Sequence, residues 1–345
     1  MGVETSSVLT LVQAVIMKFA TIKTSSPDGE LVLVSRDLSA MAKVLDIAPT
    51  LQYALDNWKE CEAALEERYQ LLNAGKLSFS QPLDAMTLGA PLPRAWQWLD
   101  GSCFLNHGHL MQKAFHLDPI EDADKFPLMY QGAGDSFCGP TDDLIVADVN
   151  HGADFEGEFG VITDAVPMGA TPQQAASAIR LIVMLNDISY RALGPREMKT
   201  GFGFVQAKGA TAFAPIVMTP DELGNNFRNF KVQLDMVIHR DGKKFGSPHG
   251  GEMHFGFDQL ISHAALTRKL NPGTVIGSGT VSNEDPAVGQ ACIAELRAKE
   301  MIANGSPDTP FLTHGEVITL KATDQTGRSV FGEIRQHVVV ENYNV

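Results

Sequence analysis

The sequence predicts an α+β protein that is mainly β, with a small α+β domain at its N-terminus. Apolar or alternating runs typical of strands recur through most of the 345 residues, separated by glycine, proline and Asp/Asn turns. These runs do not alternate regularly with helical segments, so a doubly wound parallel sheet is not expected. The segment 89–94 has two prolines in three residues and marks the candidate boundary between the two parts.

These signals divide the chain into three parts. The apolar run near the start is too short to span a bilayer, and Glu4 stands where an export signal would carry positive charge. No export signal is therefore expected. The division places an extension or leader at residues 1–16, a small domain at 17–90 and the functional domain at 91–345.

Helices and strands are expected in both domains. Apolar residues at helical spacing predict one helix over about 51–71, and Thr171-Pro172 predicts the start of another that continues through Ile179 and Leu181. A third helix is expected over 258–267. The expected strands are 18–23, 30–35, 144–147, 159–162, 232–239, 274–277, 317–322 and 331–340.

Composition limits the classes of partner. Lys+Arg 27 against Asp+Glu 41 gives a net charge of −14, which speaks against a nucleic-acid groove or an anionic membrane surface. The four cysteines are scattered without a C-x-x-C pair, so neither a structural zinc site nor a disulfide framework is indicated. We expect a cytoplasmic protein, and small molecules, metals or protein partners remain as its possible partners.

The stretch 154–162 contains the most informative motif. Glu156 and Glu158 stand two residues apart in an apolar, strand-like run, so they would point to the same face. When partly buried, such a pair is tolerated if it shares a proton, meets Arg or Lys, or binds a cation. An all-oxygen ligand set suits hard cations such as magnesium, calcium or manganese. The alternative is an edge strand with a solvated acidic face.

Other polar residues are ambiguous when each is taken alone. Asp100 and His107 share a loop-like stretch, and Asp187 follows an apolar run, where a cap or turn residue is common. Lys208 lies among glycines and apolar residues, where a lysine needs an anion nearby unless it is exposed. Glu295 interrupts an apolar run, and the alternative is a position on a helix surface.

The order and spacing of these residues resemble the fumarylacetoacetate hydrolase family over most of the stretch 100–333. The most specific parts are the Glu-x-Glu strand, the Asn-Asp-x-Ser-x-Arg stretch 186–191, the following Lys-Gly, and the Gly-Ser-Gly-Thr-Val-Ser loop 277–282. That loop lacks the Gly-Lys-Ser/Thr of a nucleotide-binding loop. The segment before Pro91 is similar to a small N-terminal domain that some bacterial members carry.

The resemblance implies a mixed β-sandwich roll, a homodimer and a divalent-metal site. Magnesium is the first choice of metal, with manganese or calcium as alternatives. By position, the implied metal ligands are Asp100, Glu156, Glu158 and Asp187. The implied catalytic residues are His107, Glu295 and Lys208, and the implied substrate-binding residues are Tyr130, Thr280 and Arg191.

The function expected from this resemblance is metal-dependent hydrolysis of a carbon-carbon bond in a 1,3-diketo acid. The substrate would be an acylpyruvate or resemble fumarylacetoacetate, in the breakdown of tyrosine or another aromatic compound, and His107 with Glu295 would activate the water. One alternative is a 2-keto acid decarboxylase of the oxaloacetate type, a hydratase or an isomerase that uses the same metal-enolate site. Another is a non-catalytic, metal-stabilised binding protein.

Overall fold

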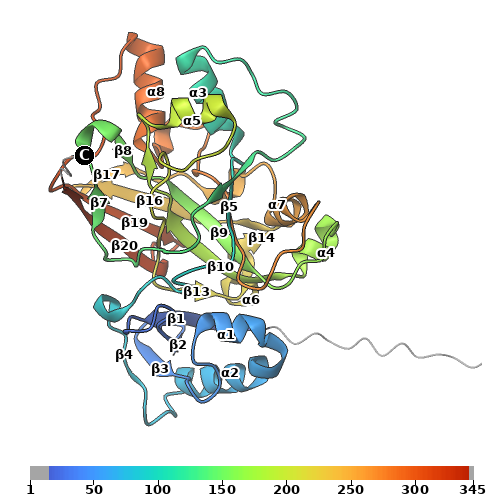
Figure 1. Ribbon diagram of the computed structural model, residues 1–345. Coiled ribbons are helices and arrows are strands. Elements are labelled where there is room, and N and C mark those ends of the chain that lie inside the picture. Colours follow the sequence, from blue (N-terminus) through green and yellow to red (C-terminus); the bar gives the residue numbers. More distant parts are fainter. Residues whose placement is uncertain (1–14, 342–345) are drawn as a thin grey trace, which may run out of the picture.

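Two β-sheets pack against each other in the computed structural model, which describes residues 15–341 (Figure 1). The expected extension at 1–16 lies outside the described residues except for Val15 and Ile16, which pack against the core. The larger sheet runs through both parts of the chain. Its strands, in spatial order, are β4 (Gln81–Pro82), β3 (Ala40–Lys43), β2 (Glu30–Val34), β1 (Lys18–Ile22), β13 (Val217–Met218), β10 (Ile179–Asn186), β9 (Gly157–Thr163), β18 (Val275–Gly277), β5 (Trp98–Gly101) and β6 (Met129–Gly132), with β12 (Ala212–Phe213) also pairing with β10.

The N-terminal segment joins this sheet through β1, in which Lys18 pairs with Met218 of β13. Helices α1 (Leu51–Asp56) and α2 (Trp58–Asn73) cover its strands, where the sequence predicted one continuous helix. The helix is interrupted at Asn57, whose backbone angles are not helical. The predicted boundary segment is mostly buried, with Ala90 and Leu92 in the core. The division into domains stays a prediction.

The smaller sheet faces β9 and β10 across the core. The rings of Phe159 on β9 and Phe331 lie 6.4 Å apart between the two sheets. Gly157 is needed at this interface, because a Cβ there would lie 2.9 Å from Met236 Cγ. The strands of the smaller sheet, in spatial order, are β17 (Lys243–Gly246), β16 (Asp235–Arg240), β19 (Val317–Thr323), β20 (Ser329–Val340) and β7 (Leu144–Val146). Two further pairs of short strands lie outside both sheets: β8 (Ala153–Asp154) with β11 (Ser189–Tyr190), and β14 (Phe227–Arg228) with β15 (Lys231–Val232).

Pairing among the described strands is antiparallel except for β18 with β5 and β20 with β7, which agrees with the predicted fold class. Strand β9 lies between β10 and β18 and is buried along its whole length. The alternative of an edge strand with a solvated acidic face is therefore wrong. Glu158 lies in the centre of the large sheet.

The helix predicted to continue from Thr171 through Leu181 is shorter than expected. It ends at Ala176, and Ile179 already begins β10. The stretch from Ile179 onward is rich in β-branched residues and is almost completely buried between neighbouring strands, which outweighs its helix-like apolar spacing. The remaining helices are α3 (Leu105–Phe115), α4 (Pro172–Ala176), α5 (Gly194–Thr200), α6 (Pro220–Leu223), α7 (Phe257–Ala264) and α8 (Ile293–Asn304).

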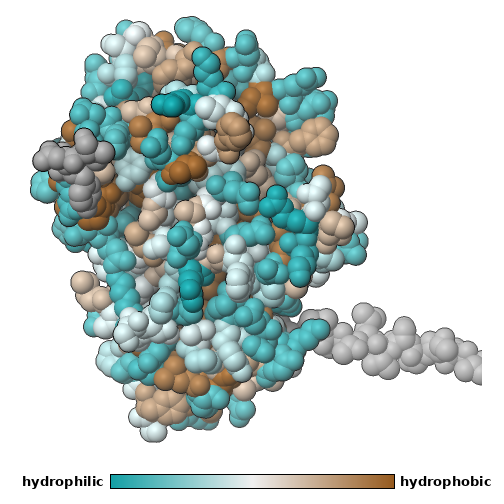
Figure 2. Space-filling model, in the orientation of Figure 1, coloured by the Kyte–Doolittle hydropathy of each residue, from teal (hydrophilic) through white to brown (hydrophobic). Residues whose placement is uncertain are grey.

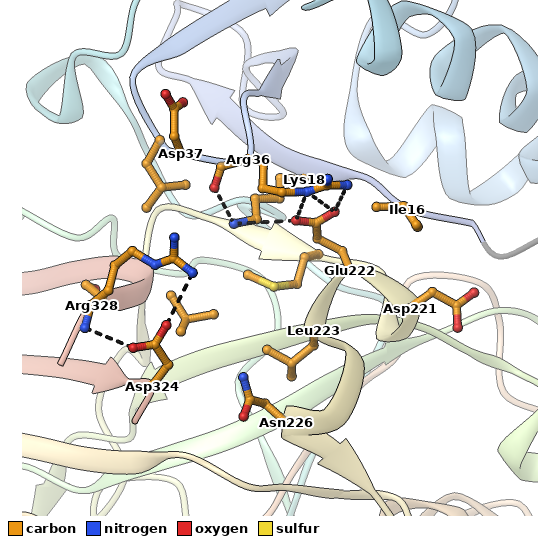
Figure 3. Close-up of a pocket in the computed structure, with 14 residues that line it drawn as sticks. Ile16, Lys18, Arg36, Asp37, Asp221, Glu222, Leu223, Asn226, Asp324 and Arg328 are labelled. Carbon is orange, nitrogen blue, oxygen red and sulfur yellow. Dashed lines mark hydrogen bonds and ion pairs between the residues drawn. The ribbon is translucent and has the colours of Figure 1, made fainter. Parts of the chain in front are cut away.

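A cavity of about 320 Å³ lies where the N-terminal segment meets the rest of the chain (Figure 3). Arg36 donates to both carboxylate oxygens of Glu222, and the Lys18 ammonium lies 3.8 Å from the same carboxylate. No residue of the predicted site lines this cavity. The cavity lies at a polar contact between the two parts of the chain and is not the candidate site.

Helices α3, α5 and α8 lie at the end of the molecule opposite α1 and α2 (Figure 1). On the face shown in Figure 2, hydrophilic side chains are interspersed with smaller hydrophobic groups. Within residues 15–341, no helix has the length and apolarity that crossing a bilayer requires.

Candidate metal and catalytic site

Three predicted metal ligands come together inside the large sheet. Asp100 lies on β5, Glu158 on β9, and Asp187 directly after β10. Each offers a carboxylate oxygen that lies within 4.8 Å of the oxygens of the other two. Their exposed fractions are 3%, 0% and 0%. A cluster of three carboxylates is thus held away from water.

Backbone pairing explains why these side chains meet. In the antiparallel pair of β9 and β10, Glu158 stands opposite Leu185, so the end of β10 brings Asp187 to the same place. The pairing extends one residue beyond the two strands, because Asp187 N donates to Glu156 O at 3.0 Å. On the other side, Gly279 N donates to Asp100 Oδ1 at 3.0 Å. Gly279 has φ of 77° and a Cβ would lie 2.3 Å from Gly101 O, so only glycine fits.

The Glu158 carboxylate shows that this cluster fits a cation. Neither of its buried oxygens has a hydrogen-bond partner. Burial, with Asp100 as the next contributor, raises the pKa of Glu158 well above its usual range. Burial and then Asp187 raise the pKa of Asp100 to about 8. A divalent cation would satisfy these oxygens, and an all-oxygen set suits the hard cations magnesium, manganese and calcium.

Glu156 is not part of the three-carboxylate group. Its Oε1 accepts from Arg191 Nη2 and its Oε2 from Lys208 Nζ, both at 2.6 Å. Burial would raise the pKa of Glu156, but Lys208 and Arg191 outweigh burial and hold it well below its usual range. The carboxylate is therefore ionised and neutralised by two cations. Its role as a fourth metal ligand stays a prediction.

Asp187 is surrounded by donors. Lys208 Nζ and the Tyr130 hydroxyl each donate to Asp187 Oδ2 at 2.6 Å, and Thr211 Oγ1 donates to Oδ1 at 3.0 Å. Lys208 Nζ also lies 5.1 Å from the centre of the Tyr130 ring. Burial lowers the pKa of Lys208, but Asp187 and Glu156 outweigh burial and raise it. Lys208 is thus a permanently charged ammonium beside the cluster, and the alternative of an exposed loop lysine is wrong.

His107 and Glu295 form a hydrogen-bonded pair beside these carboxylates. His107 Nδ1 lies 2.8 Å from Glu295 Oε1, and the Glu295 side chain is 1% exposed. Since an ionised carboxylate can only accept, Nδ1 carries the proton and Nε2 is free to act as a base. When its ring is protonated, His107 lies close enough to Glu156 to lower the pKa of that carboxyl group. The pair resembles a base with its orienting carboxylate.

The structure brings His107 and Glu295 together, as the resemblance implied, but the elements around them differ from the interpretation of the sequence. His107 lies on α3, where a loop was expected, and Glu295 faces inward on α8 rather than lying on a helix surface. Helices α3 and α8 contact each other, which brings the two residues together over 188 positions of sequence. Thr280 is buried beside Gly279, and Arg191 contacts two carboxylates. Their roles in substrate binding stay predictions.

Four supporting residues were not among the predicted site residues. Asp154 accepts from two backbone N–H groups of α8 and from Arg191, and Thr211 donates to Asp187. Gln336 on β20 accepts from Asn186, whose own side-chain oxygen holds the Glu156 backbone N–H at 2.9 Å. Cys292 offers its sulfur within 4.8 Å of the His107 and Glu295 ligand atoms. For Asp154, the sequence offered one signal: it stands two residues before Glu156, at the same spacing that separates Glu156 from Glu158.

The raised pKa of Asp100 predicts how stability depends on pH. Between about pH 4 and about pH 8, the folded metal-free protein keeps a proton on Asp100 that the unfolded chain has released. The free energy of unfolding should therefore fall as pH rises through this window. Urea unfolding at several pH values, with and without saturating Mn²⁺, measures this. A metal-free protein that gains stability through the window would contradict the assignment, whereas bound metal should remove the decline because it replaces the proton.

Comparison with curated proteins shows that the chain is similar to a protein named as an enzyme. A 2,4-didehydro-3-deoxy-L-rhamnonate hydrolase of Sphingomonas sp. (strain SKA58) is 28% identical over 167 residues, which are 48% of this chain and 54% of the relative. The match therefore spans about half the length of that curated relative. The relative is named as a hydrolase.

Two solved structures share the fold. One is a Mycobacterium abscessus protein described as a probable 2-hydroxyhepta-2,4-diene-1,7-dioate isomerase, with a TM-score of 0.63, 19% identity, and coverage of 95% of this chain and 100% of that one. The other is maleylpyruvate hydrolase from Sphingobium sp. SYK-6 in complex with manganese(II) ion and pyruvate, with a TM-score of 0.62, 16% identity, and coverage of 94% and 100%.

Two family profiles match consecutive parts of the chain. Residues 17–94 match the fumarylacetoacetase N-terminal domain 2, and residues 97–339 match the fumarylacetoacetate (FAA) hydrolase C-terminal domain. Together with the fold shared by the solved structures, these matches establish the predicted β-sandwich fold class. The chain belongs to the fumarylacetoacetate hydrolase family.

Proposed function

We propose that this chain hydrolyses a carbon-carbon bond in a 1,3-diketo acid, such as an acylpyruvate, in a reaction that needs a divalent cation. The observation that carries the proposal is the His107–Glu295 hydrogen bond beside a buried carboxylate cluster whose Glu158 oxygens have no donor. A base for water and a cation site are the two requirements of this reaction. The hydrolase names of two relatives support the same class of reaction.

The chain's own residues account for the proton transfers. His107 Nε2 takes a proton from water, and the oxygen of that water attacks a ketone carbon of the diketo acid. Glu295 orients the imidazole and stabilises the imidazolium that forms. The bond between the attacked carbon and its neighbour then breaks, and the electron pair passes into the remaining ketone as an enolate. The imidazolium can return its proton to the enolate carbon, giving two acids.

Negative charge on the enolate oxygens must be stabilised. Asp100, Glu158 and Asp187 would hold the cation, which when bound would supply positive charge to the substrate oxygens. Lys208 adds a permanent positive charge beside Asp187, and the Tyr130 hydroxyl is a further donor there. Lys208 uses two of its three N–H donors on Glu156 and Asp187 and keeps one for a bound keto acid, whereas the single O–H of Tyr130 would have to turn away from Asp187.

The test is a turnover assay of purified protein, metal-free and with Mg²⁺ or Mn²⁺. The panel contains acylpyruvates, fumarylacetoacetate-like diketones and oxaloacetate, and products are identified by mass spectrometry. The proposal predicts two acids from a diketone, only with metal. If the metal raises the melting temperature but no carbonyl compound is converted, the chain is instead a metal-stabilised binding protein.

A second candidate is an isomerase or decarboxylase that uses the same site without hydrolytic water. The observation in its favour is the structural neighbour described as a dienedioate isomerase. Such enzymes also need an enolate to be stabilised, so loss of activity on metal removal does not separate the two candidates. Carbon dioxide with a keto acid, or a rearranged product of unchanged mass, would replace the hydrolase assignment.

Replacing Lys208 with alanine is expected to lower turnover by about a hundredfold or more, because one buried donor to the developing oxyanion is lost. Steady-state kinetics with saturating metal measures the effect, which should fall mainly on kcat. Lys43→Ala is the matched control, since Lys43 forms an ion pair with Glu30 in the N-terminal segment. Equal kinetics for the two variants would remove Lys208 from the mechanism.

A further inference from the structure

A buried carboxylate outside the metal cluster joins the two halves of the site. Asp154 is fully buried on β8. Its Oδ1 accepts from Ile293 N at 2.7 Å and its Oδ2 from Ala294 N at 2.9 Å, which are the first two residues of α8. Its Oδ2 also accepts from Arg191 Nε at 2.9 Å. One carboxylate thus receives three donors from two distant segments.

Each contact of Asp154 leads to a residue with a proposed role. Glu295 follows Ala294 directly on α8 and holds the His107 ring. The same Arg191 guanidinium donates through Nη2 to Glu156 Oε1 at 2.6 Å. Asp154 thus satisfies the free N–H groups at the start of α8 and, through Arg191, connects that turn to the Glu-x-Glu strand.

We propose that Asp154 is a positioning residue that sets the place of the His107–Glu295 pair relative to the carboxylate cluster. Its effect on turnover rests on the proposed function, whereas its effect on the histidine does not. The residues of the base lie on α3 and α8, whereas those of the cation site lie on β5, on β9 and directly after β10. Supporting residues of this kind hold reactive groups in productive geometry.

The substitution Asp154→Asn tests this with little change of shape. An amide has one acceptor oxygen and one NH₂ group, so whichever way it points, its NH₂ faces at least one of the three N–H donors. The first turn of α8 or the Arg191 fork must then shift. The matched control is Asp164→Asn, which breaks an aspartate–arginine pair with Arg180 just beyond the far end of β9.

Turnover should fall about 10- to 100-fold in Asp154→Asn and less than about twofold in Asp164→Asn, the range typical of residues that support a reactive site. The double variant Asp154→Asn/Glu295→Gln should be little worse than Glu295→Gln alone, because Asp154 acts through the same helix. Unchanged turnover in Asp154→Asn, or strictly additive losses in the double variant, would overturn the proposal.

A second readout needs no substrate. The Nδ1 proton of His107, hydrogen-bonded to Glu295, should give a downfield proton NMR signal that His107→Ala removes. We expect the signal to be lost or shifted in Asp154→Asn and kept in Asp164→Asn. A signal unchanged in Asp154→Asn overturns the positioning role whatever the kinetics show. If the signal changes but no diketo acid is converted even by the wild type, the proposed function fails and the positioning role stands.

Folding of each variant is checked by circular dichroism. Should Asp154→Asn fail to fold, Asp154→Glu is the second variant, because it keeps the charge but moves the carboxylate by one methylene. The same losses of turnover and of the His107 signal are expected for it, and wild-type values for both would overturn the proposal.

Discussion

Replacing Glu158 with glutamine is expected to abolish tight binding of the divalent cation and, at the same time, to stabilise the metal-free protein. The Glu158 carboxylate is fully buried, and neither oxygen has a hydrogen-bond donor. Loss of a direct ligand should weaken Mn²⁺ binding by about a hundredfold or more, since even supporting residues cost about 10- to 100-fold. Glutamine removes a buried carboxyl group that must otherwise carry a charge or take up a proton, so the free energy of unfolding at about pH 8 should rise by about 1 kcal/mol or more.

Opposite signs for the two effects make this test specific. Isothermal titration with Mn²⁺ gives the affinity, and urea unfolding of metal-free protein gives the stability. Glu60→Gln on the exposed face of α2 is the control and should change neither. A Glu158→Gln variant that is destabilised without metal would show that Glu158 serves the fold rather than a cation.

Replacing His107 with alanine is expected to lower turnover by about a thousandfold while leaving the cation bound, because general-base catalysis contributes about 10²- to 10⁴-fold. His107 does not belong to the three-carboxylate group, so the affinity for Mn²⁺ should not change. The loss should appear in kcat at saturating metal and substrate. Single-turnover kinetics would show that the chemical step is slowed.

His109→Ala is the matched control, because His109 is exposed on the same helix two residues further on. It should retain wild-type turnover. Full activity in His107→Ala would mean that water is activated elsewhere or that the reaction is not a hydrolysis, which would favour the isomerase or decarboxylase alternative.

Strands and the order of the site residues could be predicted from the sequence. The runs at 18–23, 30–35, 317–322 and 331–340 lie within one or two residues of β1, β2, β19 and β20, because apolar alternation or continuous apolar runs with turn residues at the ends are strong signals. The spacing of two residues between Glu156 and Glu158 pointed to a cation or a basic partner. In the structure, Glu156 meets the basic side chains of Arg191 and Lys208, whereas neither oxygen of Glu158 has a hydrogen-bond partner, so a cation at Glu158 stays a prediction.

The parts that could not be predicted depend on contacts between distant segments. Ile179 and Leu181 have helix-like spacing, and only the neighbouring strands make them part of β10. The stretch with His107 was interpreted as loop-like, whereas it forms α3, which packs on α8 from a distant part of the chain. Asp154 contacts Ile293 across 139 positions of sequence, and no local pattern indicates such a pair.

The central claim is that Asp100, Glu158 and Asp187 hold a divalent cation beside the His107–Glu295 pair. An anomalous difference map from crystals grown with Mn²⁺ tests it most directly, because the map locates manganese without any assumption about the reaction. The account predicts a peak in contact with oxygens of all three carboxylates. A peak at His107, Cys292 and Glu295 instead, or no peak at the carboxylates at saturating Mn²⁺, would contradict it.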